Sequence, residues 1–336
     1  MRSAGRRGSR ILAAALALGL AASAAGLFAR TASAQAPASA DGARQLERLR
    51  TALEAGRTAE VIPELTQLAS EGSVRATIWL AKVRLEQGRP TDAMALLEGA
   101  LEAAPHAEAL LRDYARAALA GQAPSAAASA LERLLHLFPD HGRYAYMLGV
   151  TRLQLGDPVA AESALRIATT RLEPPDRALL ALGVVQNKLK RFDDARRSLR
   201  QSLALEPGEP EAMAGLAEAL HGLGELDAAE RQARLTLEAA PDHGTGHLLS
   251  GRVAMYRGEY EKAATALETA VAVDPEEPRA HYQLGLAYAR LGDTEKSKRQ
   301  LDRYKQVLDA VEAQLTAGAP DDSRAAGPSA TRETPQ

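Results

Sequence analysis

The sequence predicts an all-α fold, an α-solenoid in which antiparallel helix pairs stack one after another along the chain. Three observations lead to this prediction: small residues recur every 34 positions, leucines recur at the same interval, and prolines close most of the intervals. A single helix pair cannot cover its own apolar face, so neighbouring pairs must stack to bury it. The interval therefore defines the structural unit of the protein.

Two series of small residues run through the chain at this spacing. The first contains only glycine and alanine: Ala81, Ala115, Gly149, Gly183, Ala217, Gly251 and Gly285. The second contains Gly88, Gly156, Gly224, Gly258 and Gly292, with Gln122 and Lys190 at the two remaining places. A glycine inside a helix costs about 1 kcal/mol relative to alanine. We therefore expect the paired helices to approach each other closely at the small residues.

Seven gapless units follow from the spacing. They cover residues 74–107, 108–141, 142–175, 176–209, 210–243, 244–277 and 278–311. Residues 42–73 show a similar helical rhythm of apolar residues without a closing proline, and we expect a degenerate repeat that caps the array. Residues 312–336 finish the last helix and continue as a small, polar tail, which we expect to be disordered because it can bury little apolar area.

Each unit divides into two helices at a break. In the unit that contains Asp157 and Pro158, these residues form an N-cap and a first helical position, where proline's missing N–H is not needed. The second half of the following unit predicts a helix with one apolar face, formed by Phe192, Ala195, Leu199, Leu203 and Leu205.

This pattern resembles the tetratricopeptide repeat (TPR) family, whose helix-turn-helix units have the same length. The leucine of the family pattern is matched by Leu80, Leu148, Leu182, Leu216 and Leu284. The aromatic positions differ, since His247 and His281 stand at the tryptophan position of two units and only Tyr288 keeps the tyrosine. The resemblance implies a TPR superhelix, of the kind found in exported or periplasmic bacterial proteins.

Residues 1–34 have the order of a secretory signal peptide. Four arginines precede an apolar run over residues 11–28, and the small residues of "ASA" stand directly before Gln35. We expect cleavage at this point, which leaves residues 35–41 as a linker and a periplasmic or secreted protein. The alternative is an uncleaved membrane anchor, because 18 apolar residues just reach spanning length.

Composition and motifs argue against several classes of function. The 336 residues include no cysteine, which excludes disulfides, thiolate metal sites and a lipid-modified cysteine. The net charge of −2 argues against non-specific nucleic-acid binding. Catalytic motifs are missing, and the nearest metal-like pair, His243 and His247, falls short of the three or four ligands that zinc needs. We expect no enzyme, no metal and no cofactor.

The resemblance also implies a binding surface. In TPR arrays, five positions of the first helix of each unit line a concave groove. On this chain those positions include Arg75, Lys82, Arg112, Arg116, Arg143, Arg177, Lys188, Arg252, Arg279 and Arg290, with Tyr146, Tyr256 and Tyr282. The acids at the same positions are Glu86, Glu211 and Glu218. An acidic protein would then have a basic groove, with tyrosine beside arginine as in many binding hot spots.

Other readings of these residues stay open. Charged positions can simply solvate a helix face, and tyrosines can fill space between helices. Positions expected on the outer face mix both charges: Asp92, Asp193, Asp194, Asp227, Glu261, Arg197, Arg231 and Lys262. The groove alone is one-sided in charge, although the convex face also remains a candidate binding surface.

Two functions fit these observations. The first is a non-enzymatic interaction scaffold in the bacterial cell envelope, whose groove binds an acidic or extended segment of a protein partner, with no nucleic acid and no membrane span after signal removal. The alternative is a structural component of a machine for polysaccharide synthesis and export or for outer-membrane assembly.

Overall fold

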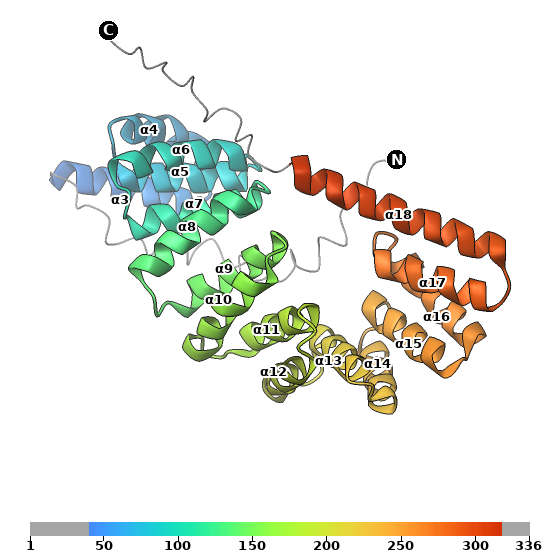
Figure 1. Cartoon of the computed structure of the whole chain (residues 1–336). Coiled ribbons are helices and arrows are strands. Elements are labelled where there is room, and N and C mark those ends of the chain that lie inside the picture. The colour runs from blue at the N-terminus through green and yellow to red at the C-terminus, as the bar shows by residue number, and fades with distance from the viewer. Residues whose placement is uncertain (1–39, 318–336) are drawn as a thin grey trace, which may run out of the picture.

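The computed structural model describes residues 40–317, which form 16 α-helices (Figure 1). They are α3 (Ala40–Glu54), α4 (Thr58–Ser70), α5 (Val74–Glu86), α6 (Pro90–Ala103), α7 (Glu108–Ala120), α8 (Pro124–Leu137), α9 (Gly142–Gln154), α10 (Pro158–Arg171), α11 (Asp176–Lys188), α12 (Phe192–Leu205), α13 (Pro210–Gly222), α14 (Leu226–Ala239), α15 (Gly244–Arg257), α16 (Tyr260–Val273), α17 (Pro278–Arg290) and α18 (Thr294–Ala317). The all-α prediction is confirmed. The predicted signal peptide and most of the predicted tail lie outside the described residues.

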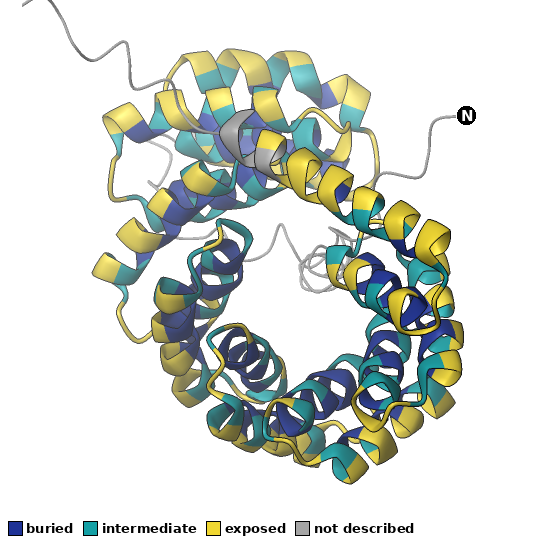
Figure 2. Ribbon diagram, turned by 45° about the vertical axis from the view of Figure 1, so that its right-hand side comes forward, coloured by how far each residue is buried: buried dark blue, intermediate teal, exposed yellow. Residues whose placement is uncertain are grey.

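The helices form two layers that follow one curve. From α5 to α17, the odd-numbered helices begin 34 residues apart, and contacts join neighbours such as α11 with α13 and α13 with α15. The odd-numbered helices are also the more buried: eight residues of α13 are buried but only three of α14. Figure 2 shows this inner layer in dark blue, with exposed surface along the outside of the ring-like array. The inner layer carries the predicted groove positions.

Close approach between the two helices of a unit depends on the first series of small residues. A Cβ atom added to Gly183 would lie 2.4 Å from the Cγ atom of Leu199, and one added to Gly149 would lie 2.5 Å from that of Leu165. Gly251 faces Leu267 in the same way, at 2.5 Å. The prediction of close approach is therefore confirmed for these glycines.

The second series has a different role, so the prediction was wrong there. Gly292 lies after the end of α17 with a φ of +80°, and nothing lies within 4 Å of an added Cβ atom. Its place requires a left-handed backbone, which glycine adopts without steric cost. Gln122 and Lys190, which interrupt the series, take φ values of +57° and +59° at the same place. The series therefore ends helices rather than bringing them together.

Polar contacts replace part of the predicted apolar face of α12. Leu205 was expected to be buried but is 47% exposed, whereas Ser202 is buried and its hydroxyl donates to the backbone oxygen of Asp176 at 2.9 Å. Ser202 and Leu199 lie three residues apart on the side of the helix that faces the core. The apolar rhythm thus breaks off before the last turn of the helix.

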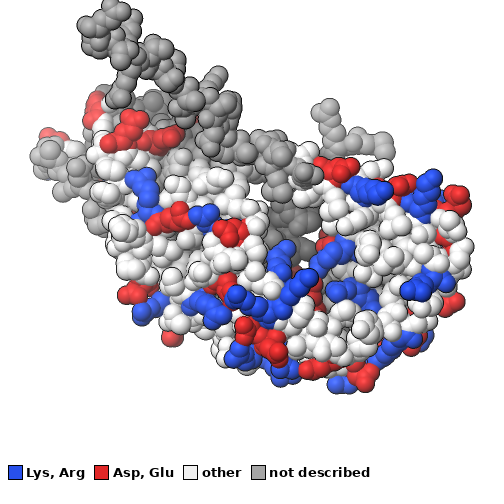
Figure 3. All heavy atoms as spheres, in the orientation of Figure 1, with Lys and Arg blue, Asp and Glu red and all other residues white. Residues whose placement is uncertain are grey.

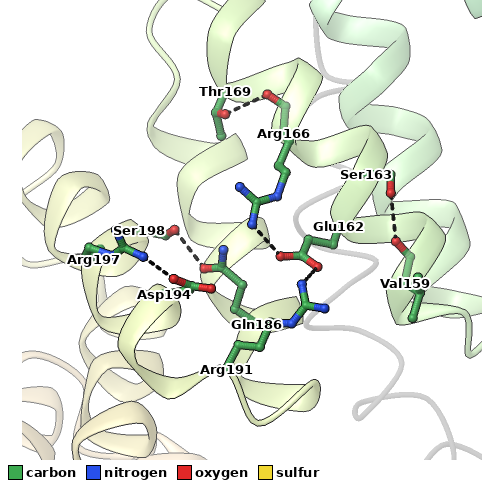
Figure 4. A network of polar contacts seen from close by, with 10 residues as sticks. All are labelled: Val159, Glu162, Ser163, Arg166, Thr169, Gln186, Arg191, Asp194, Arg197 and Ser198. Carbon is green, nitrogen blue, oxygen red and sulfur yellow. Dashed lines mark hydrogen bonds and ion pairs between the residues drawn. The ribbon is translucent and has the colours of Figure 1, made fainter.

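The outer layer is also tied together by charges, as Figure 4 shows. Glu162 on α10 is only 6% exposed in its side chain and accepts hydrogen bonds from Arg166, at 2.9 Å, and from Arg191, in the turn before α12. A buried carboxylate needs such partners, because an unpaired buried charge is costly. Arg191 thereby joins the fourth unit to the third.

The two ends of the described array differ. Helices α3 and α4 precede the first full unit, and whether they act as its cap stays a prediction. In α18, Lys298 and Lys305 are exposed at the places where Ala264 and Val271 of α16 pack on the core, 34 residues earlier. The last outer helix is therefore polar where a further unit would stack, as a terminal repeat must be.

Candidate functional site

The inner helices bring basic side chains toward the centre of the molecule. Figure 3 shows Lys and Arg gathered beside a hollow in the middle of the array, whereas blue and red alternate along its outer edge. The mixed outer edge agrees with ion pairs such as Arg196 with Asp193, at 2.7 Å, and Lys262 with Glu259, at 2.8 Å.

The predicted groove residues differ in how far they reach solvent. Exposed are Arg143, Arg177, Lys188, Arg279, Tyr256 and Tyr282. Half-buried are Arg75, Arg112, Arg116, Tyr146 and Arg252. Lys82, expected to face the groove, is only 6% exposed, and burial lowers the pKa of its ammonium group against the opposing effect of Asp113. A partner can therefore reach the first group directly but not Lys82.

A first cluster lies on α5 and α7, around an acid that the groove positions had not included. Asp113 is 2% exposed, and its two carboxylate oxygens lie 3.3 Å from Arg112 and 3.4 Å from Arg116. A signal was available in the sequence, since Arg116 stands three residues after this aspartate, a spacing at which side chains of one helix meet. Arg112 and Arg116, predicted to face the groove, therefore neutralise a buried charge.

This pairing corrects the expectation that Arg116 is an exposed groove cation. Its side chain is 23% exposed, and a reversal to glutamate would place a second carboxylate beside the buried Asp113. Such a change would destabilise the fold as well as alter the groove. Arg143 on α9 and Arg177 on α11, both exposed, are the better residues for a test of binding.

A second cluster joins α13, α15 and α17. Glu218 Oε1 accepts a hydrogen bond from Arg279 Nη1 at 2.7 Å and lies 3.9 Å from Arg252 Nη1. Arg279 also donates to Glu277 at 2.9 Å. Burial opposes the charge of Arg279, but the hydrogen bond to Glu277 and the charges of both acids outweigh it and raise its pKa. The predicted residues Glu218, Arg252 and Arg279 thus come together, whereas Glu277 was not predicted.

His221 completes this cluster as a neutral base. Burial and the neighbouring Arg252 lower the pKa of its imidazole to about 4. The ring is therefore uncharged near neutral pH, and its Nδ1 atom lies 3.3 Å from Arg252 Nη2, placed to accept a hydrogen bond. The ring of Tyr256 meets the His221 ring edge-on, with centroids 6.2 Å apart. The ring centroids of Tyr282 and Tyr304, on α18, lie 5.3 Å apart. Tyr304 was not predicted because it belongs to an outer helix.

Between the clusters, Glu209 is an acid whose pKa is raised, near Arg177. Glu209 stands directly before α13, and a hydrogen bond to Glu211, burial and the charge of Glu211 together raise its pKa to about 7. Arg177 opposes this rise. Tyr146, whose pKa burial raises, lies in the electrostatic range of the same arginine. Near neutral pH the Glu209 carboxyl group is therefore only partly ionised.

The histidines that resembled a metal pair have structural roles. His243 Nδ1 accepts from the backbone N–H of Gly246 at 3.2 Å and so caps α15, while His247 Nε2 lies 2.8 Å from the carbonyl oxygen of Pro241. His281 makes the equivalent contact with Pro275 at 3.0 Å. Over residues 40–317, no three histidine or carboxylate side chains converge as metal ligands.

Comparison with known proteins identifies the repeats. Models described as "Tetratricopeptide repeat" match residues 52–112, 84–149, 152–198, 186–252 and 279–307, and one described as "TPR repeat" matches residues 251–292. Together these matches cover well over half of the chain.

Individual relatives share shorter stretches. "Cellulose synthase operon protein C" of Pseudomonas fluorescens (strain SBW25) is 31% identical over 133 residues, which are 37% of this chain and 10% of that protein. "Protein CTR9 homolog" of Arabidopsis thaliana is 28% identical over 138 residues, 40% of this chain and 13% of that protein. The match thus spans only about a tenth of the length of these curated relatives.

Solved structures show the same fold. A tetratricopeptide repeat protein from Parabacteroides merdae has a TM-score of 0.53 at 17% identity, over 73% of this chain and 98% of its own. PilW, described as a widely conserved type IV pilus biogenesis factor, has a TM-score of 0.50 at 21% identity, over 61% of this chain and 94% of its own. None of the helices described here is both long and apolar enough to cross a membrane.

Proposed function

Since the chain belongs to the tetratricopeptide repeat family, whose arrays mediate protein–protein interaction, we propose that it is a non-enzymatic scaffold of the bacterial cell envelope. Its concave groove binds an acidic or extended segment of a partner protein. The observation that carries this proposal is the charge of the inner helices: Asp113 and Glu218 are each shared by two arginines, while Arg177 and Lys188 are exposed. The groove therefore keeps a net positive charge.

Such a surface favours an anionic partner in two ways. Arginine forms strong charge-assisted hydrogen bonds with carboxylates, and a one-sided field speeds the approach of an opposite charge. The exposed tyrosines Tyr256 and Tyr282 add amphipathic contact area that can cover the apolar parts of an extended segment. The histidines that resembled a metal pair make contacts within the fold, which supports a role in binding.

The cell-envelope part of the proposal rests on residues 1–34 and on one relative. The order of arginines, an apolar run and "ASA" supports secretion. The similarity to cellulose synthase operon protein C supports the alternative role, which is a structural part of a machine for polysaccharide synthesis and export or for outer-membrane assembly. N-terminal sequencing of protein from its native cells should begin at Gln35. An intact Met1 in the membrane fraction would show an anchor instead, and a cytoplasmic full-length chain would rule out both forms of export.

The binding surface is tested with charge reversals on the two layers. Full-length protein with Arg143→Glu and Arg177→Glu should bind a fluorescein-labelled oligoglutamate peptide at least tenfold more weakly, because two exposed cations become anions. The matched control reverses Arg200 and Arg231, exposed arginines of α12 and α14 in the outer layer, and should bind like the wild type. Weaker binding by the outer variant alone would move the binding surface to the convex face.

A further inference from the structure

One groove carboxylate holds arginines from the next two inner helices. Glu218 lies on α13, Arg252 on α15 and Arg279 on α17. The 2.7 Å hydrogen bond from Arg279 to Glu218 therefore joins two inner helices that are separated by α15 in the chain. The two residues are 61 positions apart in the sequence. In a repeat array, contacts normally join only neighbouring units. This contact therefore depends on the curvature of the array, which brings alternate inner helices together.

The three side chains have the composition of a carboxylate-recognition site. Two guanidinium groups converge on one carboxylate oxygen, at 2.7 Å and 3.9 Å. With Glu277, which also pairs with Arg279, the cluster is balanced in charge, and it has one positive charge in excess only when Glu218 leaves. The neutral His221 lies 3.3 Å from the other terminal nitrogen of Arg252, and Glu277 accepts a hydrogen bond from Arg279 at 2.9 Å. The Glu218 and Arg252 side chains are each 25% exposed and that of Arg279 is 48% exposed. A carboxylate from solvent can therefore reach both arginines.

We propose that Arg252 and Arg279 form a carboxylate-binding site of the groove, which Glu218 occupies in the free protein. A glutamate or aspartate side chain of the partner displaces Glu218 when it binds. This inference rests on the proposed function, because it takes an acidic segment as the ligand. It identifies the site at which one acidic side chain is recognised, and it identifies Glu218 as a residue of the chain that competes for this site.

The exchange is physically reasonable because the internal contact is weak but always present. A partly exposed ion pair contributes little to stability, so its loss costs the protein little. Glu218 is nevertheless attached to the same molecule, and its effective concentration at the arginines is high. An acidic partner therefore binds less tightly than the two arginines alone would allow. Arginine keeps its charge at every physiological pH, so the site remains available throughout that range.

The test removes the internal competitor without changing its size. In full-length protein, Glu218→Gln should bind a fluorescein-labelled oligoglutamate peptide about fivefold more tightly, the change that corresponds to a partly exposed ion pair. Glu86→Gln is the matched control, because it makes the same change of charge on α5, at the other end of the inner layer. It should tighten binding far less, through the general field alone.

A double-substitution cycle then assigns the gain to the two arginines. In protein that carries Arg252→Gln and Arg279→Gln, Glu218→Gln should raise the affinity for the peptide no more than Glu86→Gln does. The inference would be overturned if Glu218→Gln and Glu86→Gln raised the affinity for the peptide equally in the otherwise wild-type chain. It would also be overturned if the rise caused by Glu218→Gln persisted without the two arginines. If the peptide still binds and Arg143→Glu with Arg177→Glu still weakens it, the proposed function survives either result. If no variant binds the peptide, both proposals fail.

Discussion

At the scale of single residues, a glycine sets how closely the two helices of a unit can pack. Gly149, Gly183 and Gly251 each face a leucine sixteen residues later, and an added methyl group would overlap that leucine. In the one unit where alanine replaces this leucine, at position 233, the facing residue is Ala217, and both are fully buried. The cost of glycine in a helix is thus offset by contacts that a larger side chain would prevent.

Gly183→Ala should therefore destabilise the protein even though alanine is the better helix former. Overpacking against Leu199 is expected to cost about 1 to 3 kcal/mol, with the largest loss of hydrogen-exchange protection in α11, α12 and their neighbours. The matched control is Gly99→Ala in α6, where no atom lies within 4 Å of an added Cβ atom. It should stabilise the protein by up to about 1 kcal/mol. Urea denaturation measures both, and a shift of the two variants in the same direction would contradict the packing account.

A second residue-scale prediction concerns pH. Because the pKa of Glu209 is raised to about 7, above its ordinary value, the folded protein holds a proton that the unfolded chain releases at lower pH. The contribution of this group to the free energy of unfolding is therefore fully present below its ordinary pKa and is lost as the pH rises through 7. Urea denaturation at pH 5 and pH 8 should show that the Glu209→Gln protein loses less stability between the two pH values than the wild type. A pH dependence of stability that Glu209→Gln leaves unchanged would argue against the raised pKa of Glu209.

At the scale of elements, ion pairs between units supplement apolar packing in the outer layer. Glu162 is buried and accepts hydrogen bonds from arginines of two units, whereas Asp194 and Arg197 in the same region form a more exposed pair within α12 (Figure 4). The two pairs share the same chemistry but differ in burial. Their removal should therefore have unequal effects on stability.

Arg191→Ala should destabilise the protein by about 1 to 3 kcal/mol, because it leaves the buried carboxylate of Glu162 with one partner fewer. Hydrogen exchange should rise first in α10 and α12, which the arginine joins. Arg197→Ala is the control and should change stability by no more than about 0.5 kcal/mol, as expected for a surface pair. Equal losses would mean that burial of Glu162 does not decide the strength of its contacts.

Much of this structure could be predicted from the sequence, because helix starts and close contacts depend on local spacing. The left-handed turn at Lys190 could not, since lysine gives no signal for that backbone. The contact of Arg279 with Glu218 was beyond prediction for another reason: which acid faces an arginine two units away depends on the curvature of the whole array. Asp113 was missed because only five positions of each inner helix were taken to face the groove.

At the scale of the whole molecule, the curvature gives the inner layer properties that no single unit has. Lys188 at the end of α11 is near enough to Glu277, before α17, to help Arg279 lower the pKa of that carboxyl group against the effect of burial. Residues from four successive units therefore act on one region of the inner layer. In the function that we propose, a partner segment bound there would meet charges from a long stretch of chain.

The central claim is that the partner lies against the inner layer, and site-specific photo-crosslinking in native cells tests it most directly. A photoreactive amino acid replaces either Tyr256, 75% exposed on α15, or Leu235, 44% exposed on the outer helix α14. The account predicts one discrete crosslinked product from position 256, suppressed by Arg143→Glu with Arg177→Glu, and none from position 235. A product from position 235 alone would contradict it and place the partner on the convex face.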